Sequence, residues 1–118
     1  MAKAKKKPVG KKKAARTKRV DGIPVDLVAV GKSPIHGKGM FARKRIKANV
    51  TLGPLQGKST RKDGTYVLWL SDTEGFRVTN DFRFINHDSD PNCALTDVDV
   101  VTLRTIEAGE ELTHDYGW

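Results

Sequence analysis

The sequence predicts a mainly β domain that is preceded by a disordered basic tail. From Val20 onward, apolar residues occur in short runs separated by glycine, proline and Asn/Asp clusters, a pattern typical of many short strands. No segment keeps a convincing helical period over ten residues, and the best helical candidates are short turns at 80–84. A chain of 118 residues fits one domain with a limited core.

The positive charge is concentrated at the N-terminus. Residues 1–19 contain ten Lys or Arg and no acid, whereas residues 20–118 contain twelve basic and fourteen acidic residues, so the net charge of +8 comes from the tail. The tail has no apolar stripe, and we therefore expect residues 1–19 to be disordered and residues 20–118 to form the domain. Ten positive charges also predict sequence-independent binding to the phosphates of a nucleic acid.

Six short runs are predicted to be strands because each combines apolar, β-branched or aromatic residues and is bounded by turn-forming residues. They are residues 25–30, 39–42, 50–55, 66–70, 76–78 and 97–103. The first should end before Gly31, and 33–39 should be a loop because it contains proline and glycines. Residues 57–64 are polar and contain two glycines, which predicts a hairpin-like connection. The run 76–78 is the expected partner of 66–70.

Composition excludes several classes of protein. Cys93 is the single cysteine, so an intramolecular disulfide and a multi-cysteine zinc site are excluded. No run of about 18 apolar residues is present, which argues against a membrane span. The basic N-terminus is not followed by an apolar stretch, which argues against a signal peptide. These features predict a reducing, intracellular setting.

Three motifs carry the functional information. Residues 83–93 read Arg-Phe-Ile-Asn-His-Asp-Ser-Asp-Pro-Asn-Cys, residues 109–118 read Gly-Glu-Glu-Leu-Thr-His-Asp-Tyr-Gly-Trp, and residues 37–42 read Gly-Lys-Gly-Met-Phe-Ala. In this order and at this separation they resemble the signature motifs of SET-domain protein lysine methyltransferases, in particular small stand-alone members without the flanking zinc segments. The resemblance covers 25–118. It implies a β-clip fold of small curved sheets with a C-terminal pseudoknot, in which the last segment threads beneath the Asn86-His87 loop.

The resemblance also implies a cofactor site for S-adenosyl-L-methionine and a narrow channel for a lysine side chain. The implied cofactor contacts come from residues of all three motifs: Lys38, Gly39, Met40, Arg83, Asn86 and His87. Trp118 is expected to stack on the adenine, with a surface aromatic as the alternative. Tyr116 is the implied catalytic tyrosine, and Tyr66 aligns with a second channel tyrosine. Taken alone, the glycines and the Asn-His pair would be read as ordinary turn residues.

Two residues depart from the family pattern. His114 stands where many members have Tyr or Phe, and an imidazole there can bind the amine, hold a water or simply pack, so we expect pH-dependent turnover near neutrality. Cys93 has no cysteine-rich C-terminal segment to join, so no metal is expected and the thiol should pack as a small apolar group. A partner subunit in a homodimer is an alternative way to complete the site.

The predicted substrate is a basic protein such as a histone or a bacterial histone-like protein. Asp72, Glu74, Asp88 and Asp90 are expected to make the site's mouth acidic. Residues 15–18 match the first four residues of a eukaryotic histone H3 tail, and automethylation of the tail lysines is a further hypothesis.

Two alternatives remain open at this point. One is a non-enzymatic nucleic-acid-binding protein of chromatin or the nucleoid with a degenerate domain. The other is methylation of a ribosomal protein. The compartment is the nucleoid in a bacterial cytoplasm or a nucleus, according to the host.

Overall fold

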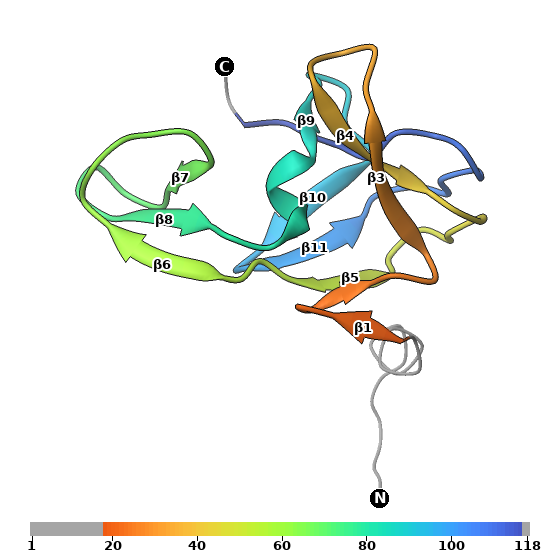
Figure 1. Cartoon of the computed structure of the whole chain (residues 1–118), viewed down its shortest axis with the longest axis horizontal. Coiled ribbons are helices and arrows are strands. Elements are labelled where there is room, and N and C mark those ends of the chain that lie inside the picture. The colour runs from red at the N-terminus through yellow and green to blue at the C-terminus, as the bar shows by residue number, and fades with distance from the viewer. Residues whose placement is uncertain (1–17, 117–118) are drawn as a thin grey trace, which may run out of the picture.

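The computed structural model describes residues 18–116 and confirms a mainly β fold of small curved sheets (Figure 1). Most of the predicted tail and Trp118 lie outside the described residues. The elements are β1 (Arg19–Val20), β2 (Ile23–Pro24), β3 (Val28–Lys32), β4 (Lys38–Ala42), β5 (Thr51–Pro54), β6 (Gly57–Thr60), β7 (Val67–Trp69), β8 (Gly75–Val78), the 3-10 helix η1 (Asp81–Phe84), β9 (Asn86–His87), β10 (Cys93–Thr96), β11 (Asp99–Thr102) and β12 (Thr113–His114).

The strands form four small sheets. The largest has the order β5-β11-β10-β12-β9, a second has the order β6-β8-β7, and β1-β2 and β3-β4 are two-stranded. The predicted pairing of β7 with β8 is confirmed, with Val67 opposite Arg77. In Figure 1 the β6-β8-β7 sheet projects to one side, and the five-stranded sheet runs through the centre of the molecule.

The predicted borders of the first strand, residues 25–30, were wrong. The first long strand begins at Val28 and continues through Gly31, which pairs with Gly39 on β4. The chain before it instead turns back as the β1-β2 hairpin, where Asp21 and Gly22 adopt positive φ angles of 53° and 79°. An Asp-Gly pair is the usual sequence of such a tight turn, so this hairpin was readable from the sequence.

The polar segment predicted as a hairpin connection contains a strand. Residues Gly57–Thr60 form β6 and pair in antiparallel register with β8. Three of the four residues are exposed, so no buried face imposes the alternation of apolar and polar residues that would reveal a strand. An alanine Cβ at Gly57 would meet the backbone of Arg77, and the close approach of these two strands therefore requires glycine.

The C-terminal segment threads between two strands that precede it in the chain, as the resemblance implies. Strand β12 pairs in parallel with β10 through Cys93 and His114, and with β9 through Thr113 and Asn86. Since parallel neighbours cannot be joined by a tight turn, β12 is connected to β10 through β11 and the long segment that follows it.

The core includes residues of the threaded C-terminal segment and of the strands beside it. Its fully buried side chains include Met40, Leu52, Phe82, Cys93, Ile106 and Leu112. The predicted packing of the Cys93 side chain is confirmed, and burial raises the pKa of its thiol to about 12. Within residues 18–116, no helix is long and apolar enough to cross a membrane.

Leu112→Ala is expected to lower the free energy of unfolding by about 2–5 kcal/mol, because truncation leaves a cavity in the core. Leu112 is fully buried, whereas Leu103 is 51% exposed and provides a matched control. Leu103→Ala should change stability by less than about 0.5 kcal/mol. Urea unfolding of the full chain measures both, and equal losses would contradict the packing of the C-terminal segment described above.

Candidate functional site

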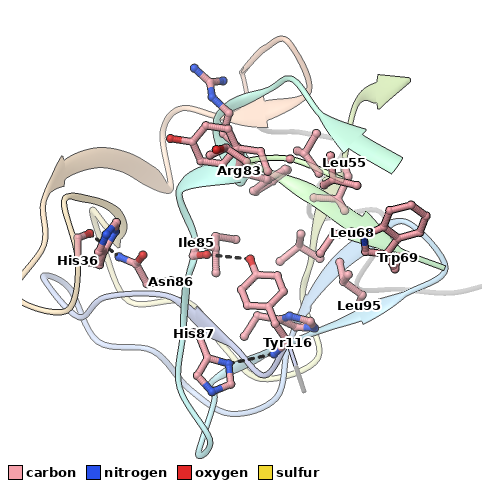
Figure 2. A pocket seen from close by; sticks show the side chains of 18 of the residues that line it. His36, Leu55, Leu68, Trp69, Arg83, Ile85, Asn86, His87, Leu95 and Tyr116 are labelled. Carbon is pink, nitrogen blue, oxygen red and sulfur yellow. Dashed lines mark hydrogen bonds between the residues drawn. The ribbon is translucent and has the colours of Figure 1, made fainter. Parts of the chain in front are cut away.

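A pocket of about 740 Å³ opens beside the paired strands β9 and β12 (Figure 2). One wall is apolar and includes Leu55, Leu68, Val78, Leu95 and Val100. The structure brings six of the predicted site residues into the lining: Tyr66, Arg83, Asn86, His87, His114 and Tyr116. A volume of this size, with an apolar wall and a few convergent polar groups, is typical of a small-molecule site.

Tyr116 lies at the centre of the pocket (Figure 2). Its hydroxyl donates a hydrogen bond of 2.8 Å to the backbone carbonyl of Ile85, immediately before β9. Burial raises the pKa of this hydroxyl to about 12. The side chain is therefore a neutral phenol at physiological pH, and its oxygen keeps lone pairs that can accept a further hydrogen bond.

His114 packs edge-on against Tyr116, with ring centroids 4.7 Å apart. Its Nδ1 is buried and has no hydrogen-bond partner among residues 18–116. Burial lowers the pKa of His114, as does nearby His87, while the Asp115 carboxylate acts in the opposite direction. The imidazole is therefore neutral at pH 7, and its titration moves to lower pH than the expectation of a transition near neutrality assumed.

His87 holds the C-terminal backbone in place. Its Nδ1 accepts a hydrogen bond of 3.1 Å from the Tyr116 backbone N–H. The same Nδ1 lies 3.8 Å from an Asp115 carboxylate oxygen, a contact that would be an ion pair only if Nδ1 carried a proton. Because a backbone N–H can only donate, the shorter contact requires an unprotonated Nδ1.

The Asn86 amide joins β9 to the loop between β3 and β4. Its Nδ2 lies 2.8 Å from a Glu111 carboxylate oxygen, 3.1 Å from the Ser33 hydroxyl, and 3.1 and 3.0 Å from the carbonyls of His36 and Lys38. Figure 2 shows the amide directed toward His36 and away from Tyr116. Two amide hydrogens are thus shared among four protein acceptors, and only the amide oxygen is left for a ligand.

The predicted cofactor residues of β4 differ in their surroundings. Lys38 is exposed, whereas Gly39 and Met40 are buried, and Met40 belongs to the core. A Cβ at Gly39 would collide with the Glu111 carboxylate and would lie 3.0 Å from the Ser33 Cβ. A side chain at residue 39 would therefore force Glu111 or Ser33 to shift. Gly37 adopts a positive φ of 43°, whereas the φ of Gly39 is not positive.

Tyr66 and Arg83 meet at an aromatic pair on the pocket rim. The Tyr66 and Phe84 rings contact edge-to-face at 5.8 Å, and the Arg83 guanidinium lies 4.3 Å from the Phe84 centroid. The Lys38 ammonium lies 5.4 Å from the same ring. Tyr66 has a φ of 67°, which is rare for a bulky residue and turns its side chain toward this cluster. Two cations thus flank Phe84.

The acidic residues are arranged differently from the prediction. None of Asp72, Glu74, Asp88 and Asp90 lines the pocket. The acid in the lining is Asp63, which accepts hydrogen bonds from the Trp69 indole at 3.1 Å and from the Gly64 backbone at 2.9 Å. These bonds, with that of Trp69 the larger effect, lower the pKa of Asp63.

Two residues at the centre of this arrangement were missed. The Ser33 hydroxyl donates to the Glu111 carboxylate, 2.9 and 2.7 Å from its two oxygens, and Glu111 in turn accepts from Asn86. Glu111 lies inside the C-terminal motif, so its motif position was the available signal. Ser33 had none. Among residues 18–116, no group of three or more His, Cys, Asp or Glu could hold a metal ion.

This arrangement of strands and polar residues agrees with comparisons to known proteins. The SET-domain family model matches residues 37–117, and the chain therefore belongs to the SET-domain family. Histone-lysine N-methyltransferase trithorax of Drosophila virilis is 34% identical over 116 residues, which cover 77% of this chain and 3% of that protein.

Two further relatives come from a plant and from human. Histone-lysine N-methyltransferase MEDEA of Arabidopsis thaliana is 30% identical over 75% of this chain and 16% of that protein. Histone-lysine N-methyltransferase 2B of Homo sapiens is 30% identical over 87% of this chain and 5% of that protein. The chain therefore spans only a small part of the length of these relatives.

Gly39→Ala is expected to destabilise the protein by about 1–3 kcal/mol, because the new methyl group must displace the Glu111 carboxylate or the Ser33 side chain. Gly64→Ala is the matched control, since a Cβ there meets its nearest atom at 3.6 Å and the φ is not positive. The control should stay within about 1 kcal/mol of the parent. Thermal unfolding of both variants measures the difference, and a neutral Gly39→Ala would refute the close contact.

The stability of the protein should decrease below about pH 6.5, the usual pKa of histidine, partly because of His114. In that range an unfolded His114 binds a proton, whereas the folded pKa is lowered, so the unfolded state is favoured as pH falls. Thermal unfolding between pH 8 and 5 should show a smaller acid loss for His114→Phe. His36→Phe, at an exposed histidine, is the control. Parallel curves for the parent and His114→Phe would contradict the shift.

Proposed function

We propose that this chain is an S-adenosylmethionine-dependent protein-lysine N-methyltransferase that acts on a basic protein such as a histone. The observation that carries the proposal is the partly buried Tyr116 hydroxyl, which is fixed by Ile85 in a pocket that is also lined by His87 and His114. Family membership and the names of the relatives support the same reaction class.

Residues in the pocket and beside it fit a zwitterionic cofactor with a methionine-like end. The Asn86 amide oxygen suits an ammonium group, and the two cations beside Phe84, on Lys38 and Arg83, suit a carboxylate. We propose these three residues, with the backbone at Gly39 and His87, as the holders of the cofactor. When bound, the cofactor supplies a methyl group on a positively charged sulfonium. We propose adenine stacking for Trp118, which lies outside the described residues.

The protein's own groups act on the lysine amine. A neutral amine is required, and the apolar wall formed by Leu68, Leu95 and Val100 favours it by desolvating the ammonium form. The Tyr116 oxygen, with its proton committed to Ile85, accepts an N–H from the amine and so orients the nitrogen lone pair. With a pKa near 12, this phenol is not ionised and does not serve as a strong base.

His114 and Tyr66 complete the channel in this proposal. Because burial lowers the pKa of His114, the imidazole adds no positive charge beside the incoming lysine, and its ring packs edge-on against Tyr116. Tyr66 lines the other side of the pocket, next to Asp63. A single carboxylate and aromatic rings at the opening suit a lysine-bearing basic segment. For a histone substrate we propose chromatin as the site of action.

The decisive experiment measures methyl transfer from labelled S-adenosylmethionine to core histones or to a bacterial histone-like protein. Tyr116→Phe should lower the rate by about 10²–10³-fold, because the oriented hydroxyl is lost. Calorimetry should show that the variant still binds the cofactor. Transfer at the parent rate by Tyr116→Phe would refute the assigned role.

The location of the label separates the remaining hypotheses. Label on the enzyme, located by intact mass, would support automethylation of its N-terminal lysines. Neither transfer nor cofactor binding by the parent chain would leave the non-enzymatic scaffold as the better hypothesis.

A further inference from the structure

A basic loop lies between β4 and β5 and takes no part in the pocket. Arg43, Lys44, Arg45 and Lys47 are all exposed, whereas Ile46 between them is 3% exposed. The backbone of Ile46 forms an isolated bridge with Ile106, with N–H to carbonyl distances of 2.8 Å in both directions. Burial of one side chain in the loop therefore turns its neighbours outward.

Further hydrogen bonds fix the two ends of this loop. The Thr102 hydroxyl donates to the Lys47 carbonyl at 2.7 Å, and the Asn49 N–H donates to the Thr102 carbonyl at 2.8 Å. At the other end, the Arg43 N–H donates to the Leu27 carbonyl at 2.7 Å. The cations are thus carried on an ordered backbone, and binding a partner does not need to order the loop first.

The basic loop also lies next to the point where the N-terminal segment joins the domain. The Arg43 guanidinium donates to the Val25 carbonyl at 2.7 Å, while the Val25 N–H donates to the Lys18 carbonyl at 3.2 Å. One residue therefore contacts both Arg43 and Lys18. Since residues 1–19 contain ten Lys or Arg, the most basic part of the sequence ends beside the basic loop.

Neighbouring acids neutralise only part of this charge. Arg45 pairs with Glu107 at 3.6 Å, and Asp26 is a further exposed acid beside Val25. Within residues 18–116, Lys18, Arg43, Lys44 and Lys47 form no ion pair. These four cations define the basic surface.

The basic surface and the pocket face different directions. None of the four cations lines the pocket. In Figure 1 the segment between β4 and β5 lies at the far side of the molecule from β7 and β8, which border the pocket. A polyanion on the basic surface would leave the pocket open.

We propose that Lys18, Arg43, Lys44 and Lys47 form a docking surface for the phosphate backbone of double-stranded DNA. Phosphate contacts from Lys and Arg suffice for sequence-independent binding. The loop 43–47 has no aromatic residue on which an unpaired base could stack, and this favours a duplex over single-stranded RNA. The enzyme thus holds DNA on one side while a DNA-bound basic protein enters the pocket on another.

The test is the affinity of the full chain for a short fluorescent DNA duplex, measured by anisotropy between about 50 and 200 mM salt. No cofactor or histone is added, so the result does not depend on methyl transfer. Arg43→Gln/Lys44→Gln/Lys47→Gln should reduce the magnitude of the slope of log K against log salt by about 2–3, or roughly 0.9 for each phosphate that the protein no longer neutralises. The double variant Lys44→Gln/Lys47→Gln keeps the Arg43 bond to Val25. It should reduce the magnitude of the same slope by about 2.

The matched control is Lys58→Gln/Arg61→Gln/Lys62→Gln. These three exposed residues lie on or just after β6, and their substitution removes the same charge. The control should change the slope by less than about 1. Equal effects of the two triple variants would overturn the proposal, because general charge would then explain the binding. Tighter binding of a single-stranded RNA than of the duplex at equal salt would overturn it as well.

Discussion

The buried side chain of Asn92 is the interaction on which the rest of the site depends. Its Nδ2 donates to the Glu111 carbonyl at 2.8 Å, and its Oδ1 accepts from the Thr113 N–H at 2.8 Å. The Asn92 N–H also contacts the Thr113 hydroxyl at 3.2 Å. One amide just before β10 thus satisfies the backbone of the threaded segment on both sides of Leu112. Without it, the buried Thr113 N–H and the partly buried Glu111 carbonyl would lose these partners.

This clamp explains how distant segments form one pocket. Once β12 is fixed between β9 and β10, the residue before it and the residue after it contact different segments of the chain. Glu111 reaches Ser33 and Asn86 and orders the loop before β4, whereas Tyr116 reaches Ile85 and forms the centre of the pocket. A single carboxylate therefore links the C-terminal motif to the Asn86 motif and to the loop before β4.

The sequence predicted the family, and six of the residues that gather in one pocket, better than it predicted the borders of the strands. The three motifs identified a SET domain because Asn86, His87 and Tyr116 occur in a specific order, and six predicted residues line one pocket. Strand β6 was missed because an exposed edge has no apolar alternation to reveal it. Glu111 was overlooked although it stood in a motif, because its role depends on contacts 25 and 78 residues away in the chain.

The sequence by itself determined the family, the chemical types of the site residues and the concentration of charge at the N-terminus, because these depend on the identity and order of residues. Only the tertiary structure decided which glycines leave no room for a side chain, that burial lowers the pKa of His114, and that Arg43 and Lys18 contact the same residue. These properties depend on burial and on hydrogen bonds between segments far apart in the chain. They arise only when the last strand passes between two strands that precede it.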